Sequence, residues 1–178
     1  MINGINLNNL HTYAALIKKQ PEQAISSYSI TTHWLGGVKT RICTDNQYVG
    51  STEIIKNFHF DIDEPAELLG SNTMPAPQDY LFAGLAGCMI VGFVVCASEQ
   101  GITLESVKLI IKGSLNLRGF LNIDPKAPVG FEKIEFNYQV KGSGTQADYD
   151  GIMEYVQQFS PNYRTILDKV TLSVNKEI

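Results

Sequence analysis

One uncharged stretch organises this sequence: Asp79-Tyr-Leu-Phe-Ala-Gly-Leu-Ala-Gly-Cys88-Met-Ile-Val-Gly-Phe-Val-Val-Cys96-Ala-Ser-Glu99. Nothing between the two terminal carboxylates is charged, and Cys88 lies near the middle. About 20 apolar residues at about 1.5 Å each span roughly 30 Å, which matches the hydrocarbon core of a bilayer. The stretch is therefore either a membrane span or the buried helix of a soluble protein.

Two features favour the buried helix. Both ends carry acids, and no Lys or Arg lies near either end to give a positive-inside bias. Small residues recur at every fourth position and form a flat stripe that another backbone can approach closely; they are Gly84, Cys88, Gly92 and Cys96. We therefore expect a helix that is apolar on all sides and buried in protein, and no membrane partner.

Length, charge and cysteine usage restrict the class of protein. The chain has 178 residues, a size that predicts one domain over residues 1–178. A net charge of -4 argues against a nucleic-acid partner, which would require a clustered basic face. The three cysteines are an odd number, and the start of the chain lacks the pattern of a secretory signal, so we expect reduced thiols in the cytoplasm. Without a CxxC or a Cys/His cluster, neither a metal nor another cofactor is expected.

Periodicity predicts the elements before the apolar stretch. Helical spacing indicates a helix over residues 7–19, with Pro21 after its end. Alternation of period two then predicts strands over 28–34 and 38–42, joined by a tight turn at Gly36-Gly37, and a third strand over 58–62. A loop at 66–76 leads to Pro77, which suits the first position of a helix.

The elements after the stretch follow the same patterns. Gly101 is expected to cap the long helix in the left-handed conformation. Strands are predicted from Val107 towards Leu117 and over 131–140, followed by a helix over 146–159 with the Ser160 hydroxyl pointing inward. Pro161 is expected to break this helix, and Val170, Leu172 and Val174 predict a last strand.

The order of these elements predicts an α+β fold with mostly antiparallel pairing and a long buried central helix. A helix that is apolar on all sides needs cover on all sides. One sheet and one amphipathic helix are too little for this, so we expect a second copy of the chain to supply the rest as a homodimer.

Several motifs resemble the OsmC/Ohr family of osmotically inducible and organic-hydroperoxide-resistance proteins. Asp63-Glu-Pro-Ala-Glu-Leu-Leu-Gly70 and Pro75-Ala-Pro77-Gln-Asp-Tyr-Leu-Phe-Ala-Gly-Leu-Ala-Gly-Cys88 are similar to the segment that leads to the family's reactive cysteine. Further similar runs are Leu117-Arg-Gly-Phe120, Pro128-Val-Gly-Phe131-Glu-Lys-Ile134 and Phe159-Ser-Pro161. The resemblance begins near residue 27, and residues 1–26 resemble the N-terminal helical extension of a longer branch.

The resemblance implies an OsmC-like fold and an intertwined homodimer, with a peroxide-reducing thiolate at Cys88. Such a thiolate attacks the O–O bond, becomes a sulfenic acid and releases an alcohol. Cys88 lies about three turns into its helix, where the helix dipole contributes little, so an arginine must stabilise the thiolate.

The resemblance also assigns the remaining candidate site residues. Arg41 best matches the family's arginine, with Lys39 as the alternative, and Gln78 stands where the peroxidases have a glutamate, so Asp79 would have to supply the carboxylate. Ser160 stands where the family has its second cysteine, and a hydroxyl cannot form a disulfide with a sulfenic acid. Gln78, Ser160 and Tyr163 are the candidates for the substrate pocket.

Two functions stay open from the sequence. In the first, the chain reduces small organic hydroperoxides with Cys88 as its single reactive cysteine, Arg41 and Asp79 as electrostatic support, and an external thiol as reductant, in oxidative-stress defence. In the second, the dimer binds a small hydrophobic ligand in an apolar pocket without peroxidase turnover.

Overall fold

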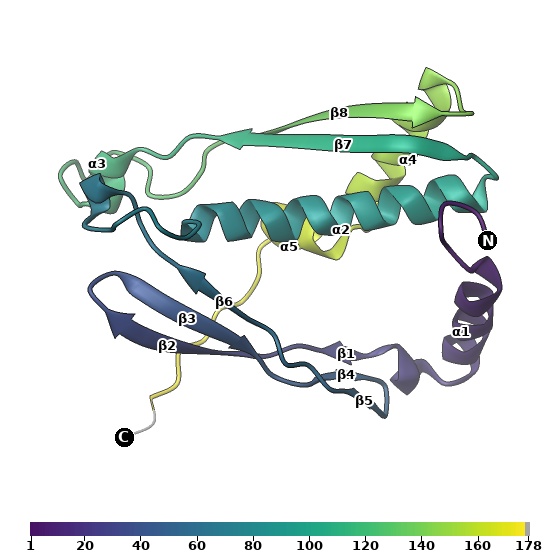
Figure 1. The fold of residues 1–178 in the computed structure, drawn as a ribbon, viewed down its shortest axis with the longest axis horizontal. Helices are drawn as coiled ribbons and strands as arrows, with labels where there is room; N and C mark the ends of the chain where they lie inside the picture. Colours follow the sequence, from purple (N-terminus) through teal and green to yellow (C-terminus); the bar gives the residue numbers. More distant parts are fainter. Residues whose placement is uncertain (177–178) are drawn as a thin grey trace. The chain divides into compact units, whose positions relative to one another are not determined.

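The computed structural model describes residues 1–176 and confirms the predicted α+β fold (Figure 1). By its internal contacts the chain divides into two compact units. The first unit contains Met1 and residues 6–83, and the second contains residues 2–5 and the chain from Gly84 onward.

The first unit begins with the predicted helix, α1 (Leu7–Lys19). Asn6 caps it, because its side-chain oxygen accepts a hydrogen bond from the N–H of Asn9. A 3-10 turn (Pro21–Ala24) follows. Three short strands that the sequence patterns did not indicate then form a small antiparallel sheet in the order β1-β4-β5: β1 (Ser26–Ser27), β4 (Gln47–Val49) and β5 (Thr52–Ile54).

A second antiparallel sheet contains the predicted strands, in the order β2-β3-β6. These are β2 (Ile30–Gly36), β3 (Lys39–Thr44) and β6 (His59–Ile62). The turn between β2 and β3 falls at the predicted glycines, and both adopt positive φ, 106° at Gly36 and 56° at Gly37. A further 3-10 turn (Ala66–Leu68) lies in the loop that follows β6.

Helix α2 (Pro77–Glu99) is the predicted long apolar helix. Gly101 ends it with φ 72°, as expected. Its buried residues all lie in the second unit and are Leu85, Met89, Phe93, Ala97 and Ser98. The single chain does not cover α2 on all sides, since Leu81 is 45% exposed and Val91 65% exposed, and cover by a second copy stays a prediction. Helix α2 is long and apolar enough to cross a membrane. The core helix of a soluble protein can have the same length and hydropathy, so this finding is weak evidence for a membrane span.

A two-stranded antiparallel ribbon runs along α2 in the second unit (Figure 1). It consists of β7 (Leu104–Gly113) and β8 (Ile134–Gly142). Alternate residues of β8 face the core, and its Tyr138 ring lies 6.5 Å from the ring of Phe93. Phe93 is fully buried, and its ring also lies 6.3 Å from that of Tyr149 on the next long helix.

That next helix, α4 (Gln146–Phe159), was predicted from its periodicity. Thr145 and Asp148 form a capping box at its start. Its buried residues complete the core of the second unit with those of α2; they are Tyr149, Ile152, Met153 and Val156.

Of three expectations for the chain after β7, two are wrong and one is confirmed. The strand does not reach Leu117, because Asn116 caps a short helix, α3 (Leu117–Phe120). The prediction that Pro161 breaks the helix is confirmed, because α4 ends at Phe159; Pro161 then occupies the first turn of a new helix, α5 (Pro161–Leu167), capped by Ser160. No strand forms at 170–174, since this part of the described chain has no strand partner to satisfy its backbone, and Leu172 is 88% exposed.

Candidate functional site

Cys88 and Ser160 face each other in the second unit. The Ser160 hydroxyl donates a hydrogen bond to the Cys88 sulfur, with 3.2 Å between Oγ and Sγ. Ser160 is only 4% exposed, which confirms the prediction that its hydroxyl points inward, and Cys88 is half-buried. The two positions singled out by the resemblance are therefore in direct contact.

The small-residue stripe of α2 explains how the pair comes together. A Cβ added to Gly92 would lie 3.4 Å from Val156 of α4, so α4 lies close to α2 at this turn. Two turns earlier in α2, the Asn162 side chain donates a hydrogen bond of 2.8 Å to the Gly84 carbonyl. Cys88 lies between these two glycines, so α2 carries the cysteine on the face that the C-terminal helices approach.

Ser160 also joins two helices. Its N–H donates to the carbonyl of Val156 at the end of α4, at 2.8 Å. Its hydroxyl oxygen accepts from the N–H of Tyr163, at 3.5 Å, and so caps the start of α5. A single hydroxyl therefore contacts the candidate reactive sulfur and fixes the start of the last helix.

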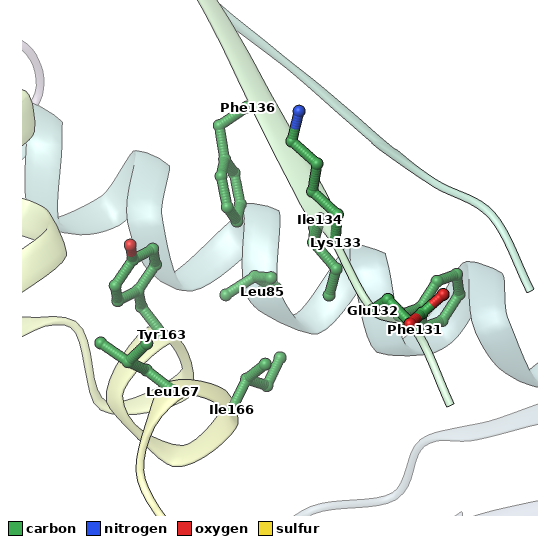
Figure 2. Close-up of a pocket in the computed structure, with 9 residues that line it drawn as sticks. All are labelled: Leu85, Phe131, Glu132, Lys133, Ile134, Phe136, Tyr163, Ile166 and Leu167. Carbon is green, nitrogen blue, oxygen red and sulfur yellow. The ribbon is translucent and has the colours of Figure 1, made fainter. Parts of the chain in front are cut away.

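A pocket of about 260 Å3 lies within the second unit (Figure 2). It is lined by Leu85, Phe131, Glu132, Lys133, Ile134, Phe136, Tyr163, Ile166 and Leu167. Leu85 precedes Cys88 by three residues on α2, and α5 supplies three of the lining residues. Of the three predicted substrate-pocket residues, the structure thus places Tyr163 in a pocket wall.

The other two cysteines differ from Cys88 in their surroundings. Burial is the main factor that raises the pKa of the Cys96 thiol above its ordinary value, which disfavours the reactive thiolate. Cys43 lies on β3, paired with Thr31 and His59 on the neighbouring strands. All three cysteines are free thiols.

Arg41 forms a bidentate ion pair within the first unit. Its Nε lies 2.7 Å and its Nη2 2.8 Å from the two carboxylate oxygens of Asp61, the residue opposite it on β6. The hydrogen bond from Arg41 is the main cause that lowers the pKa of Asp61, so this carboxylate stays ionised. The pairing of Arg41 with the Cys88 thiolate stays a prediction.

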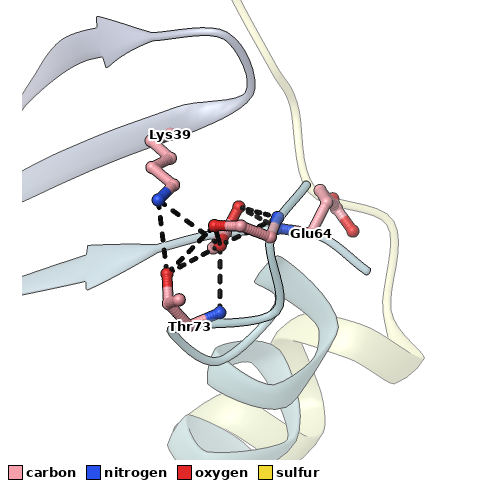
Figure 3. A network of polar contacts seen from close by, with 5 residues as sticks. Lys39, Glu64 and Thr73 are labelled. Atoms are coloured by element: carbon pink, nitrogen blue, oxygen red, sulfur yellow. Dashed lines mark hydrogen bonds and ion pairs between the residues drawn. The ribbon is translucent and has the colours of Figure 1, made fainter. Parts of the chain in front are cut away.

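Lys39 points towards Thr73 (Figure 3) and lies near a different carboxylate, that of Asp63. Its Nζ lies 3.9 Å from Asp63 Oδ2 and 3.3 Å from the Thr73 hydroxyl. Asp63 is fully buried and accepts hydrogen bonds from the N–H groups of Glu64, Ser71 and Thr73 and from the hydroxyls of the last two. Led by the Thr73 N–H, these bonds outweigh desolvation and hold the pKa of Asp63 well below its usual range. The Lys39 ammonium group therefore interacts with the loop that precedes α2.

Asp79 and Gln78 lie in the first turn of α2. An oxygen of the Asp79 carboxylate accepts a hydrogen bond of 2.9 Å from the N–H of Ala76, which fixes the chain where it enters the helix. In the next position, the Tyr80 hydroxyl donates to the Asp61 carbonyl at 2.9 Å, and its ring lies 4.6 Å from that of Phe60. Asp79 therefore acts as a capping residue, and Gln78 is half-buried beside it.

The sequence patterns missed Asp63, Asn162 and helix α5. Ser160-Pro161 could have revealed α5, because a serine N-cap followed by proline is a typical helix start. Asp63 and Asn162 gave no such signal, since their partners depend on the tertiary structure. Among residues 1–176, no group of three or more His, Cys, Asp or Glu side chains is placed to hold a metal ion.

Comparisons with known proteins bear on the family and the fold of this chain. A family model described as OsmC-like protein matches residues 70–175. Among proteins with curated descriptions, none matches this sequence.

Solved structures share the fold at low sequence identity. An OsmC-like protein from Mycoplasma pneumoniae is 17% identical with a TM-score of 0.62, and the alignment covers 79% of this chain and 87% of that one. An OsmC-like protein of unknown function from Vibrio cholerae is 14% identical with a TM-score of 0.62, covering 79% and 94%. An organic hydroperoxide resistance protein from Legionella pneumophila is 20% identical with a TM-score of 0.54, covering 79% and 88%. The predicted OsmC-like fold is confirmed.

Proposed function

Because this chain belongs to the OsmC-like protein family, we propose that it reduces small organic hydroperoxides with Cys88 and an external thiol. The proposal extends to a role in oxidative-stress defence in the cytoplasm. The observation that carries it is the 3.2 Å contact between the Ser160 hydroxyl and the Cys88 sulfur.

The chemistry begins at the Cys88 sulfur. The thiolate attacks the terminal oxygen of the hydroperoxide, an S–O bond forms, the O–O bond breaks, and the alkoxide leaves and takes up a proton as the alcohol. The Ser160 hydroxyl donates a hydrogen bond to the sulfur and so lies directly beside the reacting atom. Cys88 leaves this step as a sulfenic acid.

Recycling must use a thiol from outside the chain. The position that contacts Cys88 carries a hydroxyl, which cannot form a disulfide. One external thiol condenses with the sulfenic acid to give a mixed disulfide and water. A second thiol then attacks that disulfide, which restores the Cys88 thiol and releases the oxidised reductant.

Arg41 is the proposed electrostatic partner of the thiolate, with Asp79 as the supporting carboxylate. A guanidinium has five N–H donors, and Asp61 occupies only the edge that carries Nε and Nη2. The other edge of Arg41 can therefore pair with an anion. Lys39 is the weaker candidate, because the buried Asp63 and Thr73 engage its ammonium group.

A homodimer is part of the proposal. In the single chain, large apolar side chains are exposed on both units, for example Trp34 at 75% and Ile30 at 60% on β2, and Val91 at 65% on α2. Exposed apolar surface of this extent is typical of protein interfaces. A second copy of the chain would cover it.

The apolar pocket supports a second candidate function. It is lined mainly by aliphatic and aromatic side chains, among them Leu85, which precedes Cys88 by three residues on α2. A protein that binds a small hydrophobic ligand without peroxidase turnover would need such a pocket, and it would not need a reactive thiol.

Chemical trapping of the sulfenic acid tests the proposed function. The protein is treated with one equivalent of cumene hydroperoxide in the presence of dimedone, and the labelled cysteine is identified by peptide mass spectrometry. We expect dimedone on Cys88 and not on Cys96. Labelling that is unchanged in Cys88→Ala, or no labelling in the wild type, would refute the proposal.

A further inference from the structure

Residues 2–5 form a tight turn in the second unit. The Ile5 N–H donates to the Ile2 carbonyl at 2.8 Å, and the Ile2 N–H donates to the Ile5 carbonyl at 3.3 Å. The two central residues both adopt positive φ, 50° at Asn3 and 76° at Gly4. Positive φ at both positions is typical of a type I′ turn, in which Asn-Gly is a preferred pair, so the local sequence specifies this turn.

The Asn3 side chain binds the turn to the connection between α2 and β7 (Figure 1). Its Oδ1 accepts a hydrogen bond of 2.8 Å from the N–H of Leu104, and its Nδ2 donates to the Ile102 carbonyl at 2.8 Å and to the Ser98 hydroxyl at 3.0 Å. Ser98 is only 1% exposed, and its hydroxyl donates in turn to the Val94 carbonyl at 2.7 Å. This site therefore fits a side chain that accepts on one atom and donates twice from the other, which a carboxamide does and a carboxylate does not.

The Asn-Gly pair in this turn is also prone to a spontaneous reaction, deamidation. The Gly4 backbone nitrogen attacks the side-chain carbonyl carbon of Asn3, a C–N bond forms, and the Gly4 proton and the amide group leave together as ammonia. Water then opens the cyclic imide and leaves aspartate or isoaspartate. Glycine favours the attack because it has no side chain to hinder its nitrogen. No other asparagine in the sequence precedes a glycine.

The hydrogen bonds of Asn3 oppose this reaction in the closed turn. While Nδ2 is bonded to the Ile102 carbonyl and Oδ1 to the Leu104 N–H, the carboxamide lies against the α2–β7 connection and cannot rotate onto the Gly4 nitrogen. Asn3 is half-buried, so a local opening of the turn is sufficient to free its side chain. Deamidation would therefore proceed from the open turn.

The product of deamidation would not fit the same site. A carboxylate oxygen in the place of Nδ2 would face the Ile102 carbonyl oxygen, and these are two acceptors without a proton between them. The Ser98 hydroxyl could donate to the carboxylate only by leaving the Val94 carbonyl. Isoaspartate would also lengthen the main chain by one carbon, which displaces the side chain further.

We propose that Asn3 is a deamidation site whose carboxamide acts as a latch, and that modification irreversibly releases residues 2–5 from the end of α2. The latch holds the start of α1, because Asn6, the cap of α1, follows the turn directly and α1 has no buried residue of its own. The latch does not involve Cys88, so its tests are independent of hydroperoxide reduction.

The rate of deamidation tests the modification site. The full chain and the free peptide Met-Ile-Asn-Gly-Ile-Asn are kept in the same mildly alkaline buffer, and peptide mass spectrometry follows the conversion of Asn3 to aspartate and isoaspartate. We expect the folded chain to react about 10- to 100-fold more slowly than the peptide, because the hydrogen bonds of Asn3 must open first. Equal rates, or no conversion of the folded chain, would overturn the proposal.

Two variants show whether the latch sets this rate. Ser98→Ala removes one of the hydrogen bonds of Asn3 and should accelerate deamidation by about threefold or more. Ile152→Val removes one methyl from the same core without touching the latch, and should leave the rate within about twofold of the wild type. An unchanged rate in Ser98→Ala, or an equal acceleration by both variants, would overturn the latch.

Hydrogen exchange tests the release of the turn. The Leu104 N–H reports on the latch because it donates to Asn3 Oδ1, and the distant Ser160 N–H serves as the reference. In Asn3→Asp we expect exchange at Leu104 to rise about tenfold or more, with no change at Ser160. Asn6→Asp adds the same charge three residues later and keeps an acceptable cap on α1, so it should leave Leu104 unchanged. Unchanged protection of Leu104 in Asn3→Asp, or an equal loss in Asn6→Asp, would overturn the release.

Discussion

Ser160 combines roles that a cysteine or an alanine at this position could not combine. Its hydroxyl donates to Cys88 and its oxygen caps α5, while its N–H closes the last turn of α4. An alanine would remove the donor and the cap, and a cysteine would replace the donor with a group that can form a disulfide. In the proposed reaction, this residue therefore determines how an oxidised Cys88 would return to the thiol.

Replacing the hydroxyl with a thiol should create an internal recycling route. In Ser160→Cys, treatment with one equivalent of cumene hydroperoxide should give a disulfide to Cys88, because the side chains are already in contact at 3.2 Å. Non-reducing peptide mapping and free-thiol counting measure it. In Ser160→Cys combined with Cys88→Ala, this cross-link must be absent, and two free thiols at these positions after oxidation of the single variant would contradict the predicted geometry.

Asp63 should contribute stability that depends on pH. Its pKa is depressed in the folded chain, so the contribution is fully present above the ordinary carboxyl pKa of about 4 and is lost as the pH falls below it. Asp63→Asn should lower Tm by about 5 °C or more at pH 7. Thermal denaturation from pH 7 to pH 2.5 should show this difference shrinking below pH 4. Glu105→Gln, on the exposed part of β7, should change Tm little at any pH, and a pH-independent effect of Asp63→Asn would refute the assignment.

The packing of helix α2 depends on two features of its surface, one buried apolar face and one stripe of small residues. The buried face carries Leu85, Met89 and Phe93, and the stripe lets the C-terminal helices approach.

Phe93→Ala should lower the free energy of unfolding by about 3–5 kcal/mol, because the ring is fully buried between β8 and α4. Urea denaturation gives the free energy of unfolding. Phe120→Ala, at 60% exposure in α3, is the matched control and should cost less than about 1 kcal/mol, and equal costs for the two would contradict the described core.

Elements with a strong local pattern could be predicted from the sequence. Helices α1, α2 and α4 and the β2–β3 hairpin follow from periodicity, capping residues and the Gly36-Gly37 turn. The short strands β1, β4 and β5 could not, because two or three residues show no measurable period. The segment 170–174 has the alternation of a strand but no partner among the described residues, and periodicity alone cannot supply one.

The candidate site was predictable only in part. The motif around Cys88 and the position of Ser160 were identified from the sequence, and the structure brings these two residues together. The ion pairs of Arg41 with Asp61 and of Lys39 with Asp63 were not, because cross-strand register and loop closure decide them. A sequence pattern shows which residue types are present. Which charged side chains form ion pairs with each other depends on the folded structure.

For the whole molecule, the exposed apolar side chains predict a dimer. Light scattering should give a mass of about 39 kDa, twice the 19.7 kDa of one chain. Val91→Lys places a charge on the exposed face of α2 and should shift the mass towards that of one chain, whereas Gln158→Lys, on the exposed side of α4, should not. A wild-type mass near 20 kDa at micromolar concentration would refute the dimer.

The central claim is that Cys88 alone reduces hydroperoxides with an external thiol. The most direct measurement is the consumption of cumene hydroperoxide by the wild type, with dithiothreitol or a monothiol supplied in excess, against the conservative variant Cys88→Ser. We predict that the wild type consumes many equivalents of hydroperoxide per chain and that Cys88→Ser does not exceed the rate of the thiol alone. Equal consumption by the two proteins, or a wild type that stops after one equivalent with thiol still in excess, would contradict the account.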